Sequence, residues 1–239
     1  MDGAAAFFGK EAEGMRKDEY RKIEGYMLSC MQDSAHDKDH VYRVLYNALM
    51  IAGGLPEVDM DVLVTACLLH DVGRPEQIAD PSVCHAQVGS EKAYAFLREI
   101  GWPEERAEHV RRCILSHRFR KSAPPESIEA KILYDADKLD VTGAVGVART
   151  LMYNGALNEP MYTTGADGRL SEGAEDEPDS FLREYRFKLE KVYDRFLTAP
   201  GRELAQQRRK AAKTFVDALL NEMKGPERAG LAALDGLLE

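Results

Sequence analysis

Apolar residues recur at the spacing of an α-helix along most of the chain. The stretch after Asp37 is typical, because its apolar positions fall on one side of a helix that Asp37 can cap and that Gly53-Gly54 ends. The same pattern predicts five helices in the N-terminal half, over residues 15–32, 37–52, 59–73, 80–101 and 103–117. No run alternates with period two well enough to predict a strand. The pattern therefore predicts an all-α fold.

The C-terminal half continues this pattern around one interruption. Helical segments are predicted over 127–139, 143–156, 181–197 and 202–224, followed by a short tail helix. Residues 156–180 are instead rich in glycine, acidic residues and turn formers, which predicts an exposed loop or a lid. We find no internal repeat. We therefore expect a single all-α domain over 1–239, with the C-terminal helices of 181–239 packed on its core.

Charge and composition exclude several classes of protein. The chain carries 32 Lys and Arg against 41 Asp and Glu, a net charge of −9, which argues against a large nucleic-acid footprint. A small phosphorylated ligand stays compatible, because a few arginines or a metal ion can reverse the sign inside a cleft. We find no signal peptide and no apolar run long enough for a membrane, so we expect a cytoplasmic protein. The four separated cysteines predict reduced thiols.

Two ionisable residues, His70 and Asp71, end the apolar stretch "LLHDVGR". A buried carboxylate costs several kcal/mol unless it is paired or binds a cation. Just beyond a helix end, both side chains can reach the same ion. Imidazole nitrogen and carboxylate oxygen together suit a divalent metal such as Mn, Fe, Co or Mg.

Further donors lie on other predicted helices. His40 occurs in "HDKDHVYRV", and Asp135, Asp137 and Asp140 occur in "LYDADKLD". His40 precedes His70 by 30 residues and Asp71 precedes Asp137 by 66, which excludes a finger-type zinc loop. Ligands gathered from separate helices would instead line a cleft of a helical bundle.

The ordered set His40, His70-Asp71 and Asp137 resembles the HD superfamily of metal-dependent phosphohydrolases, and in particular its small bacterial stand-alone hydrolases. The resemblance covers residues 34–149. It implies a single helical bundle of the HD-domain type with extra C-terminal helices, and a motif core at 34–150. It also implies that His40, His70, Asp71 and Asp137 bind one divalent cation, with Mn, Mg, Co, Ni, Fe and Zn all open.

The remaining histidines leave alternatives open. His85 and His117 fall where two-metal members of the superfamily keep extra histidines, so they would line the phosphate pocket, bind a second metal, or be ordinary polar residues at helix ends. We expect His36 to cap a helix or to support His40. We expect His109, in the charged run "EERAEHVRR", on a solvated face.

Basic residues close in sequence to these ligands are candidates to stabilise a phosphoryl group, although surface cations are common. They are Arg43, Arg74, Lys138 and Arg149, with Arg118 and Arg120 for a distal phosphate. Asp140 would orient a ligand, accept a proton, or be an exposed acid at a helix break.

These features predict a divalent-metal-dependent phosphohydrolase. It would cleave a phosphate ester or anhydride of a small molecule such as a nucleotide, by attack of a metal-bound water. No P-loop or GxSxG motif offers another chemistry. Two alternatives stay open: a non-catalytic metal- and nucleotide-binding regulatory module, and a di-iron oxygenase if a second metal binds. A homodimer is open as well, and we expect no membrane partner.

Overall fold

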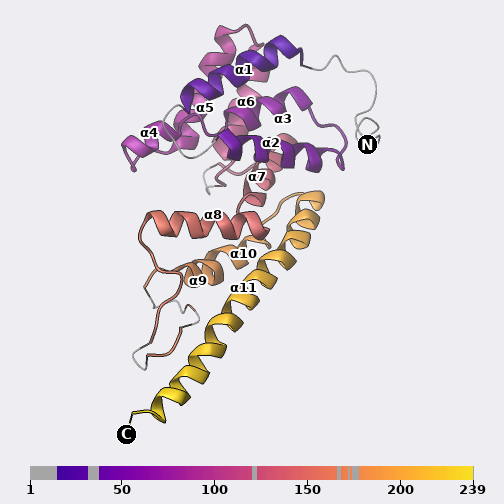
Figure 1. The fold of residues 1–239 in the computed structure, drawn as a ribbon. Helices are drawn as coiled ribbons and strands as arrows, with labels where there is room; N and C mark the ends of the chain where they lie inside the picture. The colour runs from indigo at the N-terminus through magenta and orange to yellow at the C-terminus, as the bar shows by residue number, and fades with distance from the viewer. Residues whose placement is uncertain are drawn as a thin grey trace. The chain divides into compact units, whose positions relative to one another are not determined.

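The computed structural model describes residues 15–31, 38–119, 123–165, 168–171, 173 and 178–238. Helices dominate these residues (Figure 1), which include an isolated β-bridge between Thr164 and Leu170. The predicted all-α class is therefore confirmed. Within the same ranges, every helix falls short of the length or the hydrophobicity that a bilayer-spanning helix needs.

The chain divides into two compact units. Unit 1 comprises residues 1–140 and 197–201, and unit 2 comprises residues 141–196 and 202–239. The single domain over 1–239, and the packing of the C-terminal helices on the motif core, stay predictions.

Unit 1 contains seven helices within the described ranges. They are α1 (Lys17–Cys30), α2 (Lys38–Ala52), α3 (Met60–Leu69), α4 (Arg74–Ala79), α5 (His85–Glu99), α6 (Glu104–Ser116) and α7 (Ile128–Leu139). The predicted starts of the helices over 59–73 and 127–139 are confirmed by capping side chains. The Asp59 carboxylate accepts hydrogen bonds from the first turn of α3, and the Ser127 hydroxyl accepts one from Ala130 N at the start of α7. The predicted cap Asp37 lies outside the described residues.

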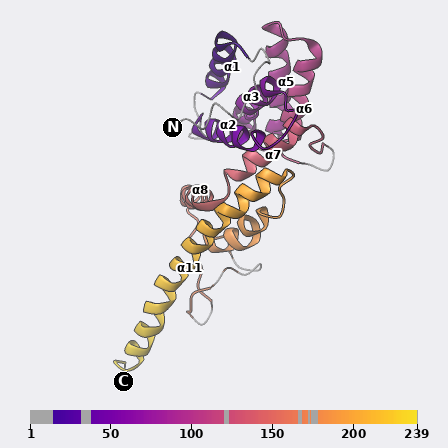
Figure 2. The same ribbon diagram turned by 90° about the vertical axis from the view of Figure 1, so that its right-hand side faces the viewer.

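The helix α3 is the centre of unit 1. It is apolar on all sides, a pattern that requires burial from every direction. It contacts α1, α2, α6 and α7, and both views place it among these helices (Figure 1, Figure 2). Leu63 and Leu68 are fully buried, and such a side chain contributes about 1.5–3 kcal/mol. His70 and Asp71 follow α3 directly, so its packing carries them into the interior.

The segment after α3 differs from the predicted one. The predicted helix 59–73 ends at Leu69, a separate helix α4 follows, and α5 begins at His85 where the sequence predicted a start at Asp80. Pro75 in the first turn of α4 explains the new helix, because proline cannot donate to a preceding turn. Gly73 makes the tight turn possible, since a Cβ there would overlap the His85 carbonyl and the Gly89 backbone. This close approach places the start of α5 beside the end of α3.

Unit 2 contains α8 (Gly143–Ala156), α9 (Phe181–Glu184), the π-helix η1 (Tyr185–Leu189) and α10 (Glu190–Val192), and most of α11 (Ala199–Asp235). Phe181, Leu182, Tyr185 and Val216 are among the buried residues of its core. The predicted helix over 181–197 is thus interrupted by a π-helical stretch. In the loop 156–180, the described residues after Leu157 form no helix, and its role as a lid stays a prediction.

The predicted helix boundaries at the end of the chain are wrong. The helix expected to stop at Lys224, with a tail helix after it, is one helix of 37 residues that contains Pro226. A proline inside a helix costs about 3 kcal/mol. The segment "ERAGLAALD" that follows is rich in strong helix formers, which favours continuing the helix past the proline.

Candidate metal centre

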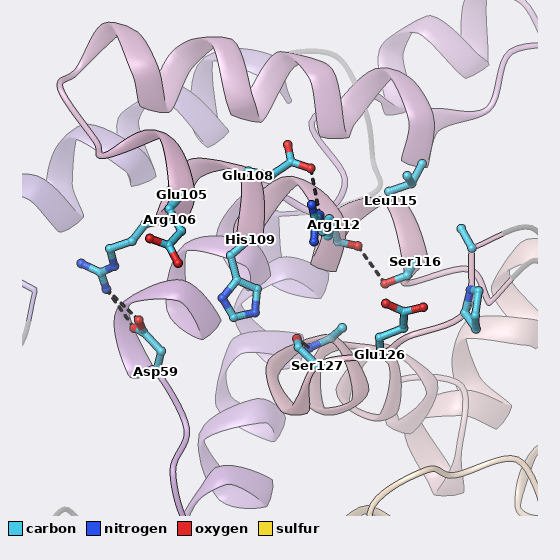
Figure 3. A pocket seen from close by; sticks show the side chains of 13 residues that line it. Asp59, Glu105, Arg106, Glu108, His109, Arg112, Leu115, Ser116, Glu126 and Ser127 are labelled. Atoms are coloured by element: carbon cyan, nitrogen blue, oxygen red, sulfur yellow. Dashed lines mark hydrogen bonds and ion pairs between the residues drawn. The ribbon is translucent and has the colours of Figure 1, made fainter.

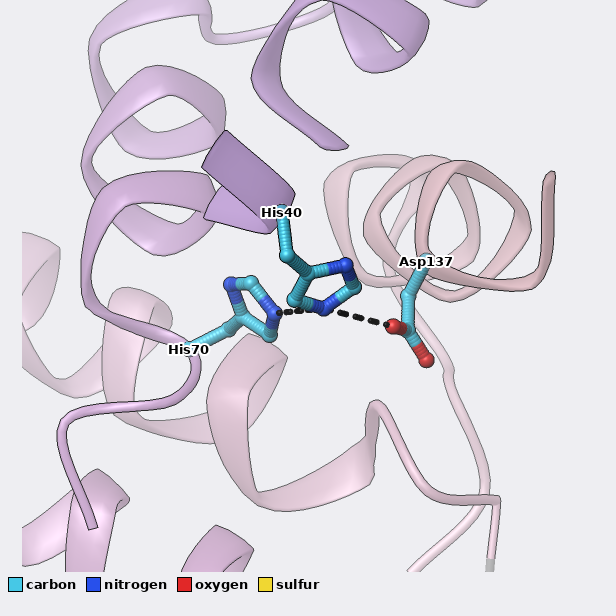
Figure 4. A group of neighbouring side chains, drawn as sticks. All are labelled: His40, His70 and Asp137. Atoms are coloured by element: carbon cyan, nitrogen blue, oxygen red, sulfur yellow. Dashed lines mark hydrogen bonds and ion pairs between the residues drawn. The ribbon is translucent and has the colours of Figure 1, made fainter. Parts of the chain in front are cut away.

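His40, His70 and Asp137 form a first group of converging side chains. His40 projects from α2, His70 follows α3, and Asp137 lies on α7 (Figure 4). His40 Nε2 lies 3.3 Å from His70 Nε2 and 3.4 Å from Asp137 Oδ1. One donor atom from each residue falls within 4.8 Å of the others, close enough to share an ion.

Asp71, His85 and His117 form a second group of the same kind. His85 begins α5 and His117 follows α6, and all three residues are buried. His85 Nε2 lies 3.3 Å from His117 Nε2 and 3.4 Å from Asp71 Oδ1. These donors also fall within 4.8 Å of one another. The structure therefore brings His85 and His117 together in the interior, at two helix ends, and their role as a second metal site or a phosphate pocket stays a prediction.

Asp71 faces both groups, one with each carboxylate oxygen. Oδ2 lies 3.7 Å from the Nε2 atoms of His40 and His70, while Oδ1 lies 3.4 Å from His85 Nε2 and 3.9 Å from His117 Nε2. A carboxylate in this position can bridge two cations.

The hydrogen bond at Nδ1 of each histidine determines whether Nε2, the nitrogen that faces the group, carries a proton. An oxygen atom accepts from every Nδ1: Asp140 Oδ2 at 2.7 Å from His40, Cys67 O at 2.7 Å from His70, Gln77 Oε1 at 2.7 Å from His85 and Ile114 O at 2.6 Å from His117. These oxygens only accept, so each Nδ1 carries a proton, and a ring without a second proton presents an Nε2 lone pair. Four Nε2 atoms and two carboxylates thus converge in one region, where the four histidines and Asp71 are buried.

This donor set fits divalent cations. Two Nε2 lone pairs 3.3 Å apart beside carboxylates would repel unless positive charge lies among them. Burial lowers the pKa of His85 to about 3 and that of His117 to about 4, so both rings are neutral near pH 7. Neutral imidazoles with ionised carboxylates are the ligand states that Mn, Fe, Co, Ni and Zn require.

The two acids stay ionised despite their surroundings. Burial works to raise the pKa of Asp71, but the neighbouring His70 and Arg74 outweigh burial and hold this pKa below its ordinary range. Burial acts on Asp137 in the same direction, and Lys138 and His40 bring its pKa well below the usual value. Both carboxylates are therefore available as anionic donors at neutral pH.

Asp140 contacts His40 on the side of the ring that faces away from the first group. It is 1% exposed, and its carboxylate accepts from His40 Nδ1 and, at 2.6 Å, from Arg43 Nε. Of the alternatives for this residue, orientation of a ligand fits the structure, and an exposed acid is wrong. Asp135 is fully buried and has a structural role. It accepts from Leu197 N and from the backbone and hydroxyl of Thr198, so it secures a neighbouring segment.

Three of the predicted cations lie beside these acids. Arg43 is bound to Asp140, Arg74 Nε donates to Asp71 Oδ1 at 3.0 Å, and Lys138 Nζ lies 3.5 Å from Asp137 Oδ2. Their side chains are 27–37% exposed, so they can reach a ligand from solvent. Contact with a phosphate stays a prediction.

The other candidates lie elsewhere. Arg149 belongs to α8 in unit 2, and its role stays a prediction. Arg118 is exposed after α6, while His36 and Arg120 lie outside the described residues. Sequence reasoning missed Gln77 on α4, which holds His85. The Gly-Arg-Pro sequence after Val72 was a signal for a new helix at this point.

A separate pocket of about 770 Å³ lies along α6, α7 and residues 123–127 (Figure 3). His109, which we expected on a solvated face, lines this pocket. Its side chain is 34% exposed, and Nε2 lies 3.1 Å from the buried Glu129 carboxylate, which also accepts from Asp59 N. None of the metal-binding candidates lines this pocket.

Comparisons with known proteins agree with this architecture. The family model described as HD domain matches residues 38–142, the stretch that carries both groups. The chain is 31% identical to the uncharacterised protein YpgQ of Bacillus subtilis over 210 residues, which cover 85% of this chain and 93% of YpgQ. The chain therefore belongs to the HD-domain superfamily.

Solved structures confirm the predicted HD-type helical fold. The crystal structure of Bacillus subtilis YpgQ in complex with ADP is 27% identical, with a TM-score of 0.66 over 86% of this chain and 98% of that one. A predicted HD superfamily hydrolase from an uncultured Thermotogales bacterium is 29% identical, with a TM-score of 0.60 over 84% of this chain and 91% of that one.

Proposed function

We propose that this protein is a divalent-metal-dependent phosphohydrolase that cleaves a phosphate ester or anhydride of a small molecule, with nucleotides as the substrate class. One observation carries the proposal: four histidine Nε2 atoms, each with its Nδ1 bound to an oxygen, converge on Asp71 and Asp137 at buried helix ends. This arrangement could hold metal ions, and it lies within a fold shared with HD-superfamily hydrolases.

The two groups define two candidate positions for a cation. His40, His70 and Asp137 would hold the first with one oxygen of Asp71, and His85, His117 and the other oxygen of Asp71 would hold the second. A bound divalent cation supplies a Lewis acid for phosphoryl oxygens and makes water a stronger nucleophile at neutral pH.

The surrounding residues complete the chemistry. Asp140 keeps the His40 ring in one orientation, and Arg74 does the same for Asp71. A guanidinium has further N–H donors besides those facing its acid, so Arg74 can bind Asp71 and still donate to a phosphoryl oxygen. Positive charge from Arg43, Arg74 and Lys138 would stabilise the negative charge of the transition state.

Two findings support a nucleotide as substrate. The related YpgQ has been crystallised in complex with ADP. The net charge of −9 disfavours long nucleic acids but not a small phosphorylated ligand, which a few cations can bind. The cytoplasmic location and a homodimer stay predictions.

The test is a metal-by-substrate screen. Metal-free protein is mixed with Mn, Mg, Co, Ni, Fe(II) or Zn and with nucleoside mono-, di- and triphosphates, and released phosphate, pyrophosphate and nucleoside are measured. We expect turnover with at least one metal and its loss in Asp137→Asn. Nucleotide binding without turnover under every metal would refute hydrolysis and favour the regulatory module. Oxygen consumption with paired iron, and no phosphate release, would favour the oxygenase.

A further inference from the structure

We propose that Gln77 is a positioning residue for the second group, acting through His85. The proposal rests on the proposed function in one respect, since it takes the second group to be a cation position. Gln77 lies on α4, the short helix between Asp71 and His85 in sequence, and its side chain makes three polar contacts with neighbouring residues.

These contacts fix which way the amide points. Gln77 Nε2 donates to Val83 O at 3.2 Å, and a carbonyl oxygen can only accept. Gln77 Oε1 lies 3.2 Å from Arg74 Nη1, and a guanidinium can only donate. Exchanging the amide oxygen and nitrogen would spoil both contacts. The oxygen therefore faces Arg74 and His85.

The amide in turn selects the tautomer of His85. Because Oε1 accepts, His85 Nδ1 must carry the proton at their 2.7 Å contact. The lone pair of Nε2 then faces Asp71 and His117. The other three histidines rely on backbone carbonyls or on Asp140, so His85 alone among the four depends on an uncharged side chain.

Without the Gln77 oxygen, nothing would hold the His85 proton on Nδ1. His85 could then protonate Nε2 and donate to Asp71 Oδ1, 3.4 Å away. That proton would occupy the place of a cation in the second group. The first group would be unaffected, because among the described residues the Gln77 side chain bonds to Arg74, Val83 and His85 and to no member of the first group.

The experiment compares four proteins without substrate: wild type, Gln77→Leu, Gln77→Glu and Gln87→Leu. Gln87 is a matched control, an exposed glutamine on α5 that donates to Glu91. Nitrogen NMR of isotope-labelled histidine reads the His85 tautomer in metal-free protein. Equilibrium dialysis against Mn²⁺ reads the number of bound ions and the affinity of each.

We expect wild type and Gln87→Leu to keep the His85 proton on Nδ1 and to bind two ions. Gln77→Leu should shift the proton towards Nε2 and weaken only the second ion, by about 10–100-fold. Gln77→Glu should bind two ions, because a carboxylate still accepts from His85 and Arg74.

Several results would overturn the proposal: one ion or none in wild type, an unchanged tautomer or second affinity in Gln77→Leu, or equal weakening of both ions. If Gln77→Leu fails to fold, Gln77→Met, which keeps the length but lacks the acceptor, decides in its place. Failure of hydrolysis with two bound ions would refute the proposed function and leave this inference intact.

Discussion

Asp135 and Asp137 are two residues apart on α7, and the structure gives them opposite roles. Asp135 is fully buried and accepts hydrogen bonds from Leu197 N at 2.8 Å, Thr198 N at 2.7 Å and Thr198 Oγ1 at 2.6 Å. Asp137 faces His40 and Lys138 in the candidate metal centre. The same Asp→Asn change should therefore lower stability at one position and metal binding at the other.

The expected loss at Asp135 follows from its bonds. An asparagine has one carbonyl oxygen, so its NH₂ group must face at least one of the three donors. Hydrogen bonds to a charged group contribute about 1.5–3 kcal/mol each, so Asp135→Asn should lower the free energy of unfolding by about 3 kcal/mol. For a chain of this size, this corresponds to a fall in Tm of about 6–12 °C.

Asp137→Asn should instead lower metal binding and have only a small effect on the stability of the metal-free protein. Without metal, it removes the partly exposed ion pair between Asp137 and Lys138, and we expect a loss of about 1 kcal/mol, smaller than that of Asp135→Asn. With Mn²⁺ at one hundred times its dissociation constant, wild type should gain about 2.7 kcal/mol of stability. Asp137→Asn should lose most of this gain, and Asp135→Asn should keep it.

Thermal and urea unfolding of the three proteins, each with and without Mn²⁺, measures these differences. The reasoning would be refuted if Asp135→Asn lost the metal-dependent gain while still folded. It would also be refuted if Asp137→Asn lowered metal-free stability as much as Asp135→Asn does.

Two further predictions follow from contacts of His40 and His109. Asp140→Asn should weaken metal binding by about 10–100-fold, because the His40 ring loses its charged partner, and calorimetric titration with Mn²⁺ measures this loss; unchanged affinity would contradict the role of Asp140. Cys113 and Glu129 raise the pKa of His109 to about 10. Because this pKa lies above the unfolded value, its stabilisation is complete below about pH 6.5 and is lost as the pH rises towards 10. After allowance for partial exposure, wild type should exceed His109→Gln by about 1–2 kcal/mol at pH 6, with urea unfolding showing the difference shrink by pH 9.5; a difference that grows with pH would contradict it.

The sequence determined the helices and the main candidates for the site. Apolar spacing is a local property, since residues three and four apart share a helix face whatever surrounds them. Capping is local too, which is why the starts predicted at residues 59 and 127 agree with the caps Asp59 and Ser127. The short helix α4 was missed because a stripe of apolar residues cannot be recognised within six residues.

Only the tertiary structure decided what each ionisable residue does. Asp135, Asp137 and Asp140 look alike in "DADKLD", yet one secures residues 197–198, one joins the first group, and one holds His40. These partners lie far away in sequence: His40 and Asp140 are 100 residues apart, and Asp135 and Thr198 are 63 apart. The packing of α2, α3 and α7 brings such residues together, and a local pattern carries no information on which distant side chains will meet. The same holds for Asp71, whose two oxygens face different groups because α3 ends between α2 on one side and α5 and α6 on the other.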